Sequence, residues 1–262
     1  MRKLPEIEHR YGDNVHILDA PLALTLLAKL CSVETTQPQI NLLVSALYRQ
    51  LVASVIGDQM PTKEVAIPTR MIKYNPEAIW CGRIVDPKIK VAIVCVARAG
   101  IYPSQVCYDF LNEILEPSGV RQDHMLMNRT VNETGQVRGA AIHGAKIGGP
   151  VDGTTLLVPD PMGATGTTIK TLLEHYRDNV SGSPARTIAL NLIVTPEYIR
   201  KLQQTFPKTL IYAYRLDRGL SPKEVLDSVP GEYWAQERGL NDQDYIVPGG
   251  GGFGEIMNNA FV

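Results

Sequence analysis

The sequence predicts an α/β fold in which helices flank a mostly parallel sheet. Residues 90–97 form a short, nearly unbroken apolar run rich in valine, which is typical of a strand buried on both faces. Three similar runs follow at 154–158, 187–194 and 209–216. Segments with helical apolar spacing separate these runs, and strands that alternate with helices in this way favour a parallel sheet.

The helices and the remaining strand are assigned from the spacing of apolar residues. Two helices are predicted before the first strand, at 21–31 and 39–58, and in the second Leu43, Leu47 and Leu51 recur every four residues. Further along the chain the spacing predicts helices at 104–115, 167–179 and 196–204 and a short strand at 125–127.

Two segments depart from this alternation. Residues 130–153 contain six glycines and little apolar periodicity, which predicts a long loop or flap. Residues 221–237 are predicted to be a small helical insertion. We therefore expect a single domain over residues 1–262, with an N-terminal helical elaboration at 1–60 and, at 217–262, the insertion plus a C-terminal hood.

Composition and charge exclude several classes of protein. The 262 residues include 26 Lys and Arg against 27 Asp and Glu, and a net charge of −1 gives no general attraction to nucleic acid or to an anionic membrane. No unbroken apolar run reaches about 18 residues, and no apolar segment follows the basic first residues, so neither a membrane span nor a secretory leader is expected. The four cysteines are far apart without metal-ligand spacing, which indicates a cytoplasmic protein with no zinc site or disulfide framework.

The most informative segment follows the apolar run at 154–158. It reads Asp160, Pro161, Met162, Gly163, Ala164, Thr165, Gly166, Thr167, Thr168, and a predicted helix starts at its end. Small residues allow backbone N–H groups to converge, the start of the helix favours an anion, and the threonines add hydroxyl donors. These features predict a phosphate-binding loop that lacks the Walker A pattern. Asp160 indicates a polyol or a hydrated metal ion, and the alternative is an ordinary strand-to-helix turn with a threonine cap.

This loop resembles the 5-phosphoribosyl-1-diphosphate (PRPP) loop of the uracil phosphoribosyltransferase family, D-P-M-x-A-T-G-[GT]-[ST], within the type I phosphoribosyltransferases. The resemblance implies that the whole loop contacts PRPP. Arg98-Ala99-Gly100 resembles the family's R-A-G loop, and Arg129, within Asn128-Arg129-Thr130, resembles a second diphosphate-binding arginine. Taken singly, an arginine after a strand is more often a surface salt-bridge partner, but two of them beside a phosphate-binding loop favour diphosphate binding.

The glycines near the C-terminus formally match GxGxxG at Gly249, Gly251 and Gly254, but only eight residues follow, too few for a dinucleotide-binding unit. A flexible tail is one interpretation, and a base-binding loop is the other, because glycines leave the backbone open to close approach. The stretch 244–249 resembles the family's Y-I-x-P-G, which implies uracil binding. The residues so implied are Tyr245, Ile246, Gly251, Gly252 and Phe253.

The chain departs from the family pattern P-G-x-G-D-A-G-D in this loop. Gly252 replaces the first aspartate, which the resemblance associates with PRPP and its Mg²⁺, Phe253 replaces the alanine, and Glu255 replaces the second aspartate. This departure leaves two alternatives open beside the enzyme. One is a phosphoribosyltransferase-like regulator that binds PRPP or a nucleotide with little or no turnover, and the other is a transferase for another base.

The resemblance implies a type I phosphoribosyltransferase fold and a glycosyltransferase reaction of pyrimidine salvage, in which uracil and PRPP give UMP and diphosphate. It implies Arg98, Arg129 and Asp160 as catalytic residues. It also implies Mg²⁺ held through PRPP without direct protein ligands, a flap over the site at 130–153, and a homodimer or larger homo-oligomer.

Overall fold

The computed structural model describes residues 4–131 and 137–261. The strands are β1 (Val15–Ile17), β2 (Thr62–Pro68), β3 (Ile79–Val85), β4 (Val91–Ala97), β5 (Val120–Val131), β6 (Val137–Lys146), β7 (Thr155–Pro159), β8 (Met162–Gly163), β9 (Arg186–Val194) and β10 (Leu210–Leu216). The helices are α1 (Pro21–Leu30), α2 (Gln39–Gln59), α3 (Ile101–Asn112), α4 (Thr167–Asn179), α5 (Pro196–Thr205), α6 (Lys223–Leu226) and α7 (Phe253–Ile256), and 3-10 turns occur at Arg70–Lys73, Pro117–Gly119 and Trp234–Gln236.

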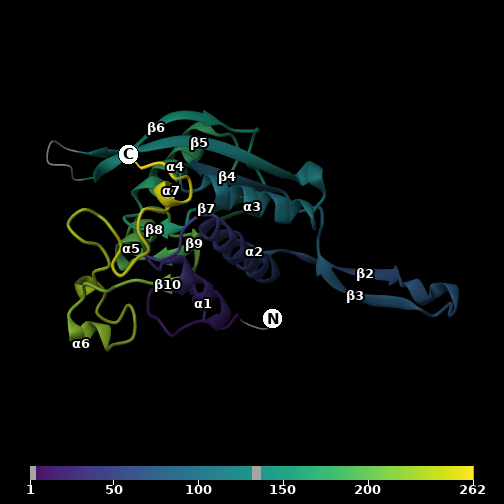
Figure 1. The fold of residues 1–262 in the computed structure, drawn as a ribbon. Coiled ribbons are helices and arrows are strands. Elements are labelled where there is room, and N and C mark those ends of the chain that lie inside the picture. The colour runs from purple at the N-terminus through teal and green to yellow at the C-terminus, as the bar shows by residue number, and fades with distance from the viewer. Residues whose placement is uncertain (1–3, 132–136, 262) are drawn as a thin grey trace.

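The sheet confirms the predicted fold class. Among the described residues eight strands join in the order β1-β10-β9-β7-β4-β5-β6, with β8 beside β9, and every neighbouring pair is parallel except β5 and β6. One buried cluster lies between the sheet and α1, α2 and α3, and a second lies between the sheet and α4 and α5. The sheet is therefore a central layer covered by helices on both faces (Figure 1).

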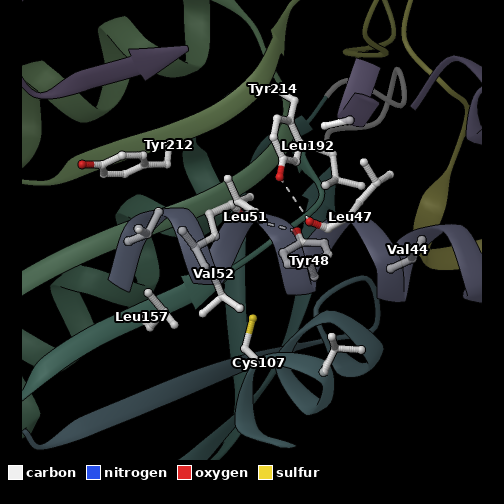
Figure 2. Close-up of a cluster of buried hydrophobic side chains, with 14 of the residues drawn as sticks. Val44, Leu47, Tyr48, Leu51, Val52, Cys107, Leu157, Leu192, Tyr212 and Tyr214 are labelled. Carbon is white, nitrogen blue, oxygen red and sulfur yellow. Dashed lines mark hydrogen bonds between the residues drawn. The ribbon is translucent and has the colours of Figure 1, made fainter. Parts of the chain in front are cut away.

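Helix α2 is the centre of the first buried cluster. Leu47, Leu51 and Val52 on α2 pack against Cys107 on α3 and Leu157 on β7 (Figure 2). The hydroxyl of Tyr48, also on α2, donates a hydrogen bond of 3.2 Å to the carbonyl of Leu190 in β9, and so links this helix to the sheet through a polar contact.

The length and composition of α2 correct one expectation from the sequence. Its 21 residues include a window of mean hydropathy 1.4, which is long and apolar enough to cross a membrane, although the sequence contains no unbroken apolar run of that length. Half of that window is buried inside the protein. Packing against α1, α3 and the sheet accounts for these apolar side chains.

Two further predictions are corrected in the region after α3, one in the length of a strand and one in the type of element. The predicted short strand at 125–127 is the middle of the twelve-residue strand β5, and much of the predicted loop at 130–153 is β6, which pairs antiparallel with β5. Residues 132–136 lie outside the described part. Because β6 is an edge strand rich in glycine and alanine, its sequence lacks the alternation that marks a half-buried strand.

The hairpin formed by β2 and β3 was not predicted from the sequence. It extends away from the body of the molecule (Figure 1), and β2 and β3 pair only with each other in the described structure. Large apolar side chains on the hairpin are exposed, so neither strand shows the inward-facing pattern that identifies strands in a sequence.

The order of the strands places a ligand-binding crevice between β4 and β7. From β4 the chain passes through α3 to β5 on one side, whereas from β7 it passes through α4 to β9 on the other side. The connections thus diverge at the carboxyl ends of β4 and β7. In open α/β sheets ligands bind at such a switch point.

Candidate active site

A cavity of about 430 Å³ lies at this switch point. It is lined by residues from four segments, 96–99, 127–128, 160–169 and 244–255, and by Tyr198. The first segment spans the end of β4, the second lies within β5, the third follows β7, and the fourth is the C-terminal hood. The cavity therefore gathers the loops that the sequence singled out separately.

The predicted site residues divide into three groups. Those that line the cavity are Arg98, Ala99, Asp160, Met162, Ala164, Thr165, Gly166, Thr168, Tyr245, Ile246, Gly251, Gly252 and Phe253. Others occupy the same loops without lining the cavity: Gly100, Pro161, Gly163 and Thr167. Arg129 belongs to β5, and its side chain lies outside the described part of the structure.

The loop at 160–168 is fixed mainly by its own backbone and by β9. The Asp160 N–H donates to the carbonyl of Leu190 at 3.0 Å, and the Asp160 carbonyl accepts from the side chain of Asn191 at 2.6 Å. The Thr195 hydroxyl donates to the carbonyl of Ala164 at 2.6 Å. These contacts come from buried residues of β9 and its end, so the loop conformation is set before any ligand binds.

The loop ends in a tight turn at the start of α4. Gly166 has a φ of +76°, a left-handed conformation that glycine adopts without steric cost. The N–H of Thr167 donates to the hydroxyl oxygen of Thr165 at 3.3 Å. The remaining N–H groups of the first turn have no partner within a helix and form an anion-binding position.

Tyr198 lines the cavity from α5 and was not found by sequence analysis. The residue is 1% exposed, and burial together with the Asp160 carboxylate raises the pKa of its phenol well above the ordinary range. The phenol therefore stays protonated. Gly163 lies directly against this ring, since a Cβ at Gly163 would approach two ring atoms at 3.1 Å. The sequence held no signal for Tyr198, because its spacing on α5 is that of a core residue.

The R-A-G segment connects β4 to α3. The peptide bond between Ala97 and Arg98 is cis, and the Arg98 side chain is exposed and donates from Nη1 to the carbonyl of Ala260 at 3.0 Å. Gly100 is required by space, since a Cβ there would lie 2.8 Å from the carbonyl oxygen of Val96 and 3.0 Å from that of Pro159. This glycine allows the loop to lie close to the end of β7.

The hood is attached to the end of β10 by a buried ion pair. Asp217 is 2% exposed, and its carboxylate accepts hydrogen bonds from Nε of Arg215 at 2.7 Å and from the N–H of Gly249 at 2.8 Å. Arg215 also donates to the carbonyl of Gly249 at 2.8 Å. Both backbone groups of Gly249, which has a φ of +62°, are thus held, and the glycine run that follows is presented to the cavity.

Whether Mg²⁺ suits the cavity depends on the charged side chains that line it. Among the described side chains that line it, Arg98 is the cation, and Asp160, Asp244 and Glu255 are carboxylates. The described residues contain no group of three side chains able to hold a metal by themselves. Mg²⁺ is usually bound by one or two carboxylates together with substrate phosphates, so this set fits an ion that arrives with a phosphorylated ligand.

The fold and the site define an α/β protein with a cavity at the switch point of a parallel sheet, lined by a loop suited to a phosphate. The model of the uracil phosphoribosyltransferase family matches residues 17–232. The chain belongs to this family. The match ends before the hood, so the segment that lines the cavity at 244–255 lies outside it.

Individual relatives agree with this family at low identity. A uracil phosphoribosyltransferase from Acidovorax ebreus is 25% identical over 243 residues, covering 92% of this chain and 96% of that protein. One from Thermococcus sibiricus is 38% identical over 77 residues, or 29% of this chain and 32% of that protein. The match thus spans about a third of the length of this relative and of those from Pyrococcus furiosus and Thermococcus gammatolerans. The structure of the AQ2163 protein from Aquifex aeolicus aligns with a TM-score of 0.70 and 18% identity, over 95% of this chain and 99% of that chain, which supports the fold alone.

Proposed function

We propose that the protein is a phosphoribosyltransferase that joins uracil to the ribosyl group of PRPP, forming UMP and diphosphate. The observation that carries this proposal is that the loop at 160–168 and the glycine-rich hood line the same cavity. One element suits a phosphate and a ribose, and the other suits a flat ring recognised by backbone groups. The family match supports the transferase class, and the names of the relatives support uracil as the base.

In this proposal the 5-phosphate of PRPP binds the backbone N–H groups and threonine hydroxyls at the start of α4. The Asp160 carboxylate accepts hydrogen bonds from the ribose hydroxyls, for which an ionised carboxylate is a suitable acceptor. Arg98 and Arg129 contact the diphosphate, since the planar guanidinium group matches phosphate oxygens in pairs. For Arg98 this requires the exchange of its bond to the Ala260 carbonyl.

The hood receives the base. Gly251 has a φ of +84° and open space where a side chain would stand, so its backbone groups are accessible to a pyrimidine edge. Ile246 and Phe253 are buried and supply an apolar wall, and Tyr245 is 46% exposed at the rim. Backbone contacts of this kind fix the base nitrogen in line with the reacting carbon.

The reaction needs no covalent intermediate on the protein. The C1–O bond to diphosphate breaks with oxocarbenium character, a bond forms from the base nitrogen to C1, and the proton of that nitrogen is released. Arg98, Arg129 and the loop N–H donors stabilise the charge on the leaving diphosphate. When bound with PRPP, Mg²⁺ neutralises part of the same charge.

The test is formation of UMP from uracil, PRPP and Mg²⁺, run beside cytosine, hypoxanthine and adenine. We expect steady diphosphate release with uracil and loss of that release in Arg129→Ala. Release with a different base would replace uracil in the proposal while retaining the transferase class. Absence of release with every base would remove the transferase proposal.

One observation favours a second candidate, a regulator that binds PRPP or a nucleotide without turnover. Position 252 carries no carboxylate, and the family match does not include the hood. Tight PRPP binding in calorimetry, combined with no diphosphate release from the base panel, would identify this second candidate.

We also propose that the protein is a cytoplasmic homo-oligomer. All four cysteines are free, as expected in a reducing compartment. The β2–β3 hairpin carries exposed apolar side chains away from the body, and an isolated two-stranded hairpin is only marginally stable in water. A second copy of the chain that covers the hairpin would remove this surface from water.

Light scattering after gel filtration should give a mass of at least twice the 28.9 kDa of one chain. The double substitution Tyr74→Ser and Ile79→Ser on the hairpin should shift the protein toward the monomer, whereas Val33→Ser, at a residue that is 99% exposed elsewhere, should have no effect. A wild-type monomer contradicts the oligomer, and an unchanged double variant contradicts the role of the hairpin.

A further inference from the structure

Gly252 lies directly against the carboxylate end of the Glu255 side chain. Gly252 has a φ of −81° and a ψ of 87°, and this φ is available to residues with side chains. A Cβ at Gly252 would nevertheless overlap Oε2 of Glu255 and lie 2.9 Å from its Cδ. The space that a side chain at 252 requires is therefore filled by the carboxylate of a residue three positions later.

This carboxylate is placed at the cavity. Glu255 is half-buried in the first turn of α7 and lines the cavity together with Ala99 and Asp160. Its neighbour Gly254 lies against the R-A-G segment, since a Cβ there would be 3.5 Å from the Ala99 nitrogen. Within the described residues, the carboxylate of Glu255 takes part in no hydrogen bond or ion pair. The contacts of the described residues therefore assign no structural partner to this charge.

The charge balance of the cavity indicates what the carboxylate binds. Among the described side chains that line the cavity, a diphosphate that enters meets one cation, Arg98, and the three carboxylates of Asp160, Asp244 and Glu255, which repel it. A divalent cation between the carboxylates and the diphosphate reverses the sign of this interaction. Mg²⁺ suits the position, because it takes oxygen ligands and is commonly shared between a carboxylate and substrate phosphates.

We propose that Glu255 binds the Mg²⁺ that accompanies the diphosphate, from the space left free by the glycine at position 252. The inference rests on the proposed use of PRPP and adds a residue to that site. In the present conformation the end of the Glu255 side chain lies where a side chain at position 252 would begin.

Calorimetry of PRPP binding, with and without Mg²⁺, tests this assignment without relying on turnover. In the wild type we expect Mg²⁺ to tighten PRPP binding. Glu255→Gln should reduce that gain by about tenfold, as for the loss of a group that supports a metal, while binding in EDTA stays unchanged. Asp242→Asn is the matched control, because it removes one charge from an exposed residue of the hood that does not line the cavity.

Moving the carboxylate to position 252 provides a second measurement. The double variant Gly252→Asp with Glu255→Ala should recover the Mg²⁺-dependent gain that Glu255→Ala loses. A thermal melt shows whether each variant is folded. Recovery in the double variant distinguishes relocation of the carboxylate from a purely structural effect of Glu255.

The outcomes separate this inference from the proposed function. If the wild type binds PRPP more tightly with Mg²⁺ and Glu255→Gln does so equally, the role of Glu255 is wrong and the proposed function stands. A wild type whose PRPP affinity is independent of Mg²⁺ also overturns the role of Glu255. If the wild type binds no PRPP, the proposed function and the inference fail together.

Discussion

Replacing Asp160 with alanine should lower kcat/KM for UMP formation by about 10²–10⁴-fold and leave the protein folded. The loss corresponds to two hydrogen bonds from ribose hydroxyls to an ionised carboxylate, at roughly 1.5–3 kcal/mol each. The backbone bonds of Asp160 to Leu190 and Asn191 do not involve the carboxylate. The side chain accepts a long hydrogen bond of 3.4 Å from the Met162 N–H.

Steady-state kinetics with varied PRPP measures this effect, and a thermal melt confirms the fold. Asp178→Ala is the control, because Asp178 lies at the far end of α4 and forms an exposed ion pair with Arg177. Exposed pairs of this kind contribute little to stability. A decrease in kcat/KM of less than about fivefold in Asp160→Ala would place the ribose elsewhere in the cavity.

The parallel part of the fold was predictable because burial leaves a pattern in the sequence. The apolar runs at β4, β7, β9 and β10 are buried on both faces, so an unbroken apolar run identified each of them. The bounds of α4 were predicted to the residue, since a glycine in a left-handed turn precedes its first threonine. In both cases a local physical requirement restricts which residues are allowed.

The hairpins were not predictable for the converse reason. Strand β2 is mostly exposed, and β6 pairs with β5 at the edge of the sheet, so neither needs a continuous apolar face. Their conformation is set by backbone pairing with a neighbouring strand, and side chains of many types permit such pairing. The same applies to the extension of β5 beyond the three residues assigned from the sequence.

The sequence identified the loop of the candidate site whose backbone is suited to bind a ligand. It did not identify the residues, distant in the sequence, that hold this loop in place. The sequence indicated the loop at 160–168 from its small residues, and the structure places most of them at the cavity. Asn191 and Thr195, which hold that loop, are ordinary residues of a strand and a helix cap. The relation between Gly252 and Glu255 depends on a three-dimensional overlap that residue spacing alone does not reveal.

One buried carboxylate, that of Glu237, attaches the insertion at 221–237 to the rest of the protein. The side chain of Glu237 is fully buried and accepts hydrogen bonds from Arg218 at 2.9 Å, from the Gly231 N–H at 2.8 Å and from the Tyr11 hydroxyl at 2.5 Å. Burial, followed by this bond to Glu237, raises the pKa of Tyr11 far above its ordinary range, so the phenol remains a donor. Glu237 thus joins the N-terminal segment to the insertion, and no described residue of 221–237 lines the cavity.

Glu237→Ala should therefore destabilise the protein by about 3–5 kcal/mol, because Arg218 loses its carboxylate partner and the Tyr11 hydroxyl and the Gly231 N–H lose their acceptor. For a chain of this size the melting temperature should fall by roughly 10 °C. Glu232→Ala, at an exposed glutamate of the same insertion, should change the stability by less than about 0.5 kcal/mol. Below its melting temperature the Glu237 variant should keep the base preference of the wild type. A changed preference with unchanged stability would instead assign the insertion to base selection, as a transferase for another base requires.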